Sequence, residues 1–417
     1  MNNSASHTPK PKTILCNGLL FLLPLVALLN QGGVSLCSFL FVLAGLFLLG
    51  EVPALMARHG RQIRWVLLAF FINFLCVLAS YVLRAAEPLG TLEKPLRMLF
   101  CASALLCVLA LRPDRKSLWW GLMGGTLAGA VYVSYQRWGL HVDRPGGVIN
   151  AITFGDLALC MGLLSLAALA AGLVASIATG ARGGWLALPV VFPVLFACRP
   201  AWRARSVALL GMLVLGLLVG AYLLPQTGVR ERVAIGVRDV QGYADGASAF
   251  TSIGLRFEMW KAGALLIARH PLAGAGIVSY KAEIRTDVAA GKLGPLILQA
   301  EHLHNDALQV LVTGGVAGLL AWAATLLAPL LFFMKFLKRP GQAGPGRAGT
   351  PQGGPGPVGS ATQATPLALA GVLLVLCYMS FGLTEAIFWS MRASLFYALM
   401  IFILMGLCLN AKEPDGK

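Results

Sequence analysis

Residues 301–322 read EHLHNDALQVLVTGGVAGLLAW, and this stretch joins a polar cluster directly to an apolar helix that should enter a membrane. The cluster contains His302, His304, Asn305 and Asp306. A histidine at the water-facing end of a buried helix is held in place yet still exchanges protons with solvent, and an ordinary pKa of about 6.5 suits that task. The same residues would also suit a helix cap at a membrane interface, so the cluster alone leaves both interpretations open.

The chain as a whole is far more apolar than a soluble domain. Of its 417 residues, 58% are hydrophobic and 12% are charged, and the mean hydropathy is +0.76. Lipid offers no partner for backbone polar groups, so apolar runs of about 15–20 residues predict α-helices that cross a membrane. The sequence therefore predicts an all-α, polytopic membrane protein of about 11 crossings. We expect apolar spans at residues 14–29, 34–50, 63–83, 96–111, 118–138, 185–198, 207–224, 315–333, 367–380 and 394–409, and within 151–181.

Basic residues in the short loops predict the orientation of these spans. The net charge of +16 comes mostly from such loops on one side of the membrane, so it is no evidence for a nucleic-acid partner. Arg58, Arg61 and Arg64 mark one cytoplasmic loop, and Lys412 places the C-terminus on the same side. The N-terminus is then cytoplasmic, and residues 225–305 face outward.

The predicted topology is inconsistent at residues 151–181. Counted from both ends of the chain, the segment begins and ends outside. As one helix it would extend about 46 Å at 1.5 Å per residue, whereas two full crossings need about 60 Å. We expect a short or re-entrant hairpin or a missing span, because an inverted half would place clusters of arginine outside.

The expected division of the chain follows its polarity. Residues 1–224 hold N-terminal transmembrane helices, 225–305 form one large polar loop with short helices, and 306–417 hold C-terminal transmembrane helices. Within the last part, residues 339–365 read RPGQAGPGRAGTPQGGPGPVGSATQAT, and this Gly and Pro content predicts a flexible cytoplasmic linker.

Two arginines in or beside the large loop are candidates for binding an anion. Residues 252–268, SIGLRFEMWKAGALLIA, predict an amphipathic helix that Ser252 caps, with Arg256 and Trp260 one turn apart. We expect this helix to lie on the membrane surface, with Trp260 at headgroup level. Arg182 stands in TGARGGW, where glycines allow close approach and a guanidinium offers paired donors. Alone, Arg182 would be an interfacial arginine; with Arg256 and His304, it suits a lipid-linked phosphate substrate.

Three motifs together resemble the O-antigen ligase family. His304 and Asn305, followed by Gly315 and Gly318, are similar to that family's signature. TGARGGW resembles its serine-arginine-glycine segment, with Ala181 where serine is common, and SIGLRFEMWKAG followed by HPLAGAG resembles its arginine-to-tryptophan loop helix. The resemblance covers about residues 179–322 and implies about twelve spans, with the large loop in the periplasm outside a bacterial inner membrane.

The same resemblance implies a reaction. Glycan would pass from undecaprenyl diphosphate to a sugar hydroxyl of the lipid A core, within a membrane and without a cofactor or metal. Arg182 and Arg256 would stabilise the leaving pyrophosphate, and His304 would take the proton of the attacking hydroxyl, with inversion at the anomeric carbon. The expected substrate-binding residues are His302, Asn305, Trp260, Lys261 and Glu385.

Several alternatives remain open on the sequence. Glu385, in the last outer loop, would orient a hydroxyl or the histidine, or would cap a helix. His302 and His304 would point apart on a helix and could share a metal only in an extended turn. The large loop has no DxD pair, and both features argue against a metal. An O-antigen polymerase or a protein O-oligosaccharyltransferase shares the superfamily. A lipid or polyprenyl-phosphate transporter predicts many ionisable residues within the spans, where Asp156 is the conspicuous one.

Overall fold

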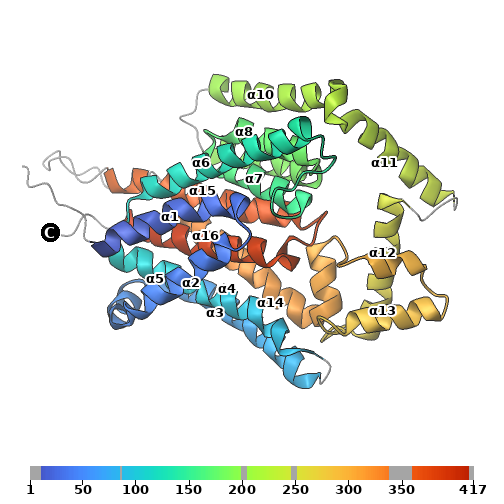
Figure 1. Ribbon diagram of the computed structural model, residues 1–417. Coiled ribbons are helices and arrows are strands. Elements are labelled where there is room, and N and C mark those ends of the chain that lie inside the picture. The colour runs from blue at the N-terminus through green and yellow to red at the C-terminus, as the bar shows by residue number, and fades with distance from the viewer. Residues whose placement is uncertain (1–10, 85–86, 199–203, 246–250, 338–358, 413–417) are drawn as a thin grey trace, which may run out of the picture.

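The computed structural model describes residues 11–84, 87–198, 204–245, 251–337 and 359–412, and every regular element among them is a helix (Figure 1). This confirms the all-α prediction. Six helical stretches in that part of the chain are long and apolar enough to cross a membrane. They are Pro11–Leu29, Leu49–Leu83, Leu89–Leu111, Asp306–Leu337, Ala364–Phe381 and Met391–Asn410. Shorter apolar helices, among them Gly33–Leu46 and Gly211–Leu223, account for other expected spans.

The N-terminal half supplies one side of the helical bundle. In chain order its helices are α1 (Pro11–Leu29), α2 (Gly33–Leu46), α3 (Val52–Leu83), α4 (Glu93–Phe100), α5 (Ala102–Leu111) and α6 (Arg115–Ser134). α1 lies along α6, and α5 lies along the last helix, α16 (Met391–Asn410). Nearly every residue of α16 is buried, from Arg392 to Leu409, so this helix forms the centre of the core.

Residues 151–181 form the expected hairpin. α7 (Ala151–Ser165) ends at Leu166, which adopts a left-handed backbone conformation (φ 52°), and α8 (Leu169–Thr179) returns along it. The two helices pack closely against each other, and Thr153–Leu164 of α7 are buried without interruption. Because α8 returns along α7, the segment begins and ends at the same face of the bundle, next to TGARGGW. That stretch continues into η4 (Gly183–Leu186) and α9 (Ala187–Cys198).

A layer of helices lies beyond one end of the long helices, at the right of Figure 1. α10 (Ala204–Leu223) leads through η5 (Pro225–Thr227) to α11 (Val229–Ala244), α12 (Ser252–Arg269), α13 (Tyr280–Ala289) and η6 (Pro295–Gln299). Thr251, rather than Ser252, caps α12, because its hydroxyl accepts the N–H of Gly254 at 3.0 Å. Met259 and Leu266 of α12 are buried in a small core that also holds Leu303 and Val312.

α14 (Asp306–Leu337) joins this layer to the membrane helices through a kink. Gly315 has φ 62°, and a Cβ there would collide with the carbonyl group of Leu272. The kink frees backbone groups that pair with the HPLAGAG segment: Ala275 N–H donates to Val312 O at 2.7 Å, and Val316 N–H donates to Pro271 O at 2.9 Å. The glycine of the signature is therefore needed for docking the loop layer onto α14.

The C-terminal part consists of α15 (Gly359–Phe381), η7 (Ile387–Trp389) and α16. Residues 359–365, which the sequence placed in the flexible linker, form the first turns of α15. The rest of the predicted linker lies outside the described residues. The connection between α15 and α16 carries Glu385 to the end of the bundle where the loop layer sits.

Candidate functional site

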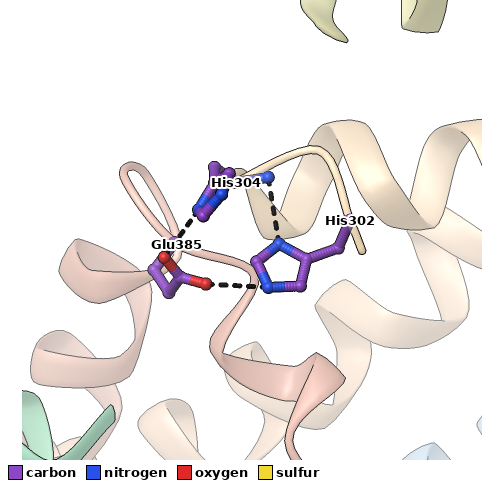
Figure 2. A group of neighbouring side chains, drawn as sticks. All are labelled: His302, His304 and Glu385. Atoms are coloured by element: carbon purple, nitrogen blue, oxygen red, sulfur yellow. Dashed lines mark hydrogen bonds and ion pairs between the residues drawn. The ribbon is translucent and has the colours of Figure 1, made fainter. Parts of the chain in front are cut away.

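Glu385 bridges the two histidines of the polar cluster. Its Oε2 lies 2.7 Å from His304 Nδ1, and its Oε1 lies 3.1 Å from His302 Nε2 (Figure 2). The side chain of Glu385 is only 7% exposed, while that of His304 is 27% exposed. His304 is therefore the member of this triad that a substrate can reach, and the buried carboxylate of Glu385 holds its imidazole from the protein interior.

The backbone explains why two histidines two positions apart share one carboxylate. Residues 301–305 are not helical, and His304 has a left-handed conformation (φ 49°). This turns both rings toward Glu385, with their centres 4.5 Å apart at an interplanar angle of 68°. The expectation that His302 and His304 point apart holds only for a helix, and α14 starts later, at Asp306.

Hydrogen bonds assign a proton to each ring. The backbone N–H of His304 donates to His302 Nδ1 at 3.3 Å, so the proton of neutral His302 lies on Nε2 and points at Glu385. His304 in turn directs Nδ1 at Glu385, which leaves its Nε2 as the basic nitrogen. This is the arrangement by which a carboxylate orients a catalytic imidazole and stabilises its protonated form.

The electrostatic environment keeps Glu385 ionised. Burial raises the pKa of its carboxyl group, but the hydrogen bond from His304 and the nearby charges of His304, His302 and Arg256 outweigh burial and lower the pKa below its ordinary value. Burial lowers the pKa of His302, and Glu385 only partly opposes this. At neutral pH the triad thus holds a carboxylate and a neutral His302.

Glu385 has a different role from the helix cap that the sequence suggested. Its carboxylate is occupied by the two histidines, and Asn305 caps α14 instead, since its Oδ1 accepts the N–H of Leu308 at 2.9 Å. Asn305 Nδ2 donates to Leu383 O at 3.1 Å. Both ends of the Asn305 amide are therefore engaged within the protein, which makes its role structural.

Arg256 lies close enough to the triad to interact with it electrostatically. Burial lowers the pKa of its guanidinium, Glu385 raises it and Arg144 lowers it, so all three charges share one region. Sequence reasoning passed over Arg144. The available signal was its place in a loop predicted to face outward, where arginine is uncommon in a short loop.

The other predicted residues of α12 are placed differently from expectation. Trp260 donates from Nε1 to Leu303 O at 3.1 Å, so it ties α12 to the chain just before His304. The apolar face of α12 is covered by protein, and the prediction that it rests on the membrane surface is wrong. The physical reason is that η6, α13 and the start of α14 already bury that face. Lys261, one residue further, is exposed.

The structure places Arg182 beside the α6–α7 loop. It is half-buried and lines a small pocket with Arg137, Asp143 and Thr227. The next residue, Gly183, packs so closely on Thr384 that a Cβ would collide with the threonine hydroxyl, and Thr384 precedes Glu385 in the chain. The backbone of TGARGGW is thus docked against the connection that carries Glu385, while the Arg182 side chain faces the α6–α7 loop.

His302, His304 and Glu385 are also potential ligands of a metal ion. One ligand atom each from His302, His304 and Glu385 lie within 4.8 Å of one another, which is close enough for a divalent ion. However, both carboxylate oxygens already stand at hydrogen-bond distance from ring nitrogens that carry protons. The geometry fits a hydrogen-bonded triad without a metal, and a bound ion would require these protons to leave.

Comparison with known proteins bears on the same region. Residues 167–323 match the family model described as O-Antigen ligase. This match includes Arg182, Arg256 and His304 and ends before Glu385. A protein of Haemophilus influenzae, described as an uncharacterized protein, is 22% identical over 293 residues, which span 65% of this chain and 73% of the relative.

Proposed function

This chain belongs to the O-antigen ligase superfamily, and on that premise we propose that it transfers an O-antigen glycan from undecaprenyl diphosphate to a sugar hydroxyl of the lipid A core. The reaction takes place at the periplasmic face of a bacterial inner membrane, where the loop layer meets the bundle. The observation that carries the proposal is the partly exposed imidazole of His304 held 2.7 Å from a buried carboxylate.

The chemical step follows from these side chains. The acceptor hydroxyl attacks the anomeric carbon, the bond from that carbon to the pyrophosphate oxygen breaks, and the pyrophosphate leaves with the bonding pair. His304 Nε2 takes the hydroxyl proton, and Glu385 stabilises the resulting imidazolium. Because attack and departure occur on opposite faces, the configuration at the anomeric carbon inverts. A proton acceptor of this kind contributes about 10²–10⁴-fold to rate.

Cationic side chains receive the leaving group. Arg256 interacts electrostatically with Glu385 and Arg144, and Arg182 precedes η4 in the stretch that packs against the connection carrying Glu385. A guanidinium matches two phosphate oxygens at once and keeps its charge, so it stabilises the pyrophosphate as the bond breaks. The Arg182 side chain lines a pocket with Arg137, and we expect it to contact the pyrophosphate when the donor binds.

A polymerase of the same superfamily uses the same chemistry with a lipid-linked glycan as acceptor, and a protein O-oligosaccharyltransferase uses it with a protein hydroxyl.

The experiment that distinguishes these functions is glycan transfer by the purified protein in detergent or nanodiscs. Undecaprenyl-diphosphate-linked glycan is the donor, and three acceptors are offered in parallel: core lipid A, a second lipid-linked glycan and a hydroxyl-bearing protein. We expect product with core lipid A alone. Product with one of the other acceptors would replace the ligase assignment.

The same assay tests the metal. With a chelator present at every stage, the parent protein should keep its full rate, because the arginines and the triad supply the charge stabilisation and the base. A loss of transfer in chelator that Mn²⁺, Mg²⁺ or Zn²⁺ restores would instead assign His302, His304 and Glu385 as metal ligands.

A further inference from the structure

Glu385 lies in a connection with little regular structure of its own. Residues 382–390 contain only the single turn η7 between α15 and α16. To reach both histidines, this connection must be held against the chain that carries them. Asp306 does part of this: its backbone N–H donates to Gly382 O at 2.8 Å, and its carboxylate accepts the N–H of Phe388 at 3.1 Å.

Lys94, at the start of α4, holds the other end of the connection. Its ammonium donates to Phe388 O at 2.7 Å and to Trp389 O at 3.3 Å. It also lies 5.4 Å from the centre of the Trp389 ring, within the range of a cation–π contact. Carbonyls at the end of a helical turn have no partner within that turn, so a cation suits this position.

The surroundings make this contact consequential for the triad. Lys94, Asp306, Phe388 and Trp389 line one cavity of about 420 Å³ between α3, α4 and α14. Phe388 O also accepts from Ser394 Oγ at 2.9 Å, so without the ammonium it is the Trp389 end of the connection that would lose a donor and have room to move into that cavity. Trp389 also lies 6.2 Å from His302, ring centre to ring centre, so a shift of Trp389 reaches the histidines directly.

We propose that Lys94 is a positioning residue for the His302–Glu385–His304 triad. It acts through the backbone of Phe388 and Trp389, which it fixes so that Glu385 meets both imidazoles. Its effect on glycan transfer rests on the proposed function, whereas its effect on the histidines does not. The N-terminal half of the chain thereby contributes to a triad whose three members lie between residues 302 and 385.

The first test is a double-mutant cycle in the transfer assay with Lys94→Met, Glu385→Gln and the double variant. Lys94→Met should lower kcat by about 10- to 100-fold, the cost of a displacement of about 1 Å at a catalytic group. The double variant should be no slower than Glu385→Gln alone, because both changes disable the same unit. Lys94→Arg keeps a cation and should recover most of the loss. Multiplying losses in the double variant would overturn the proposal.

The second test reads the histidines without transfer activity. The ring nitrogens of His302, followed by 15N NMR of histidine-labelled protein from pH 5 to 8.5, report its protonation. The Glu385 carboxylate raises the pKa of His302 against the effect of burial, so the midpoint should move to lower pH in Glu385→Gln. Lys94→Met should move it the same way, whereas Lys94→Arg and the exposed control Lys335→Met should match the parent.

The outcomes separate the two proposals. A parent midpoint retained by Lys94→Met, with thermal unfolding unchanged, would show that Lys94 does not position Glu385, whatever the transfer assay finds. A shifted midpoint in a parent protein that transfers no glycan would leave the positioning role standing and remove the ligase function. If Lys94→Met unfolds at lower temperature, the comparison with Lys94→Arg decides, because that variant retains the cation.

Discussion

Two of the histidine–glutamate pairs at the loop end of the molecule differ in how they are built. His270 and Glu283 meet at 2.9 Å between the end of α12 and α13, 13 residues apart, and their side chains are 35% and 30% exposed. His304 and Glu385 meet at 2.7 Å across 81 residues, with Glu385 almost fully buried and shared with His302. The first pair joins two adjacent helices at the surface, whereas the second is assembled by the tertiary fold.

The contrast shows why a short distance alone does not identify a catalytic pair. Glu283 also forms an ion pair with Arg269 at 3.7 Å, and both side chains are partly exposed; Arg269 in turn reaches the buried carboxylate of Asp287. Such surface pairs contribute little to stability and nothing to a buried reaction centre. Glu385 instead holds two imidazoles and feels Arg256, in a place where water competes less.

The largest expected effect breaks the comparison at the base itself. His304→Ala should lower transfer by about 10³-fold, within the range for loss of a general base. His270→Ala removes a histidine of the same kind from a similar carboxylate and should leave the rate within about twofold, since surface substitutions rarely matter. Initial rates with saturating donor and acceptor measure both. Full activity of His304→Ala would remove the base from the mechanism.

The carboxylates provide the next comparison. Glu385→Gln should lower kcat by about 10- to 100-fold, as a neutral amide no longer stabilises the imidazolium. It should also move the NMR titration profile of His302 to lower pH, because the Glu385 carboxylate raises the pKa of that ring and an amide does not. Glu283→Gln should change neither quantity. An unshifted profile in Glu385→Gln would mean that this carboxylate does not face His302.

Arginine substitutions test the donor side of the site. Arg256→Ala should lower kcat/KM by about 10- to 100-fold, because a preorganised cation beside the departing pyrophosphate is lost. Arg230→Ala, an exposed arginine on α11, is the matched control and should stay near the parent. Arg256→Lys should recover only part of the loss, since lysine lacks the paired donors of a guanidinium. Equal rates for both alanine variants would place the pyrophosphate elsewhere.

The smallest expected effect concerns the ion pairs that Arg269 forms with Glu283 and Asp287, and it is an effect on stability alone. A hydrogen bond from Arg269 at 2.7 Å lowers the pKa of Asp287 below its ordinary value, with burial opposing and nearby cations adding to the effect. A carboxyl group with a lowered folded pKa stabilises the fold above its unfolded pKa, and this stabilisation is lost as pH falls through the folded pKa. Melting temperatures from pH 6 to 3 should therefore fall less steeply for Asp287→Asn than for the parent. Identical slopes would contradict this account.

Motif spacing and hydropathy predicted different features of the molecule. His304 and Arg256 could be identified because their neighbours in sequence carry the pattern, and the structure places both around Glu385. Arg182 was found in the same way, yet its side chain lines a pocket with Arg137. Hydropathy marked the apolar segments correctly, but it could not tell a helix covered by lipid from α12, whose apolar face is covered by α13 and α14.

The sequence by itself determined that the chain is helical and crosses a membrane, since both follow from the length and polarity of local segments. It also determined which histidine stands at the end of which helix. Only the tertiary structure decided the partners of that histidine: the turn at 301–305 brings His302 and His304 onto one carboxylate, and Lys94 and Asp306 hold that carboxylate in place. These contacts join residues between 81 and 294 positions apart, and local patterns carry no information about which distant groups meet.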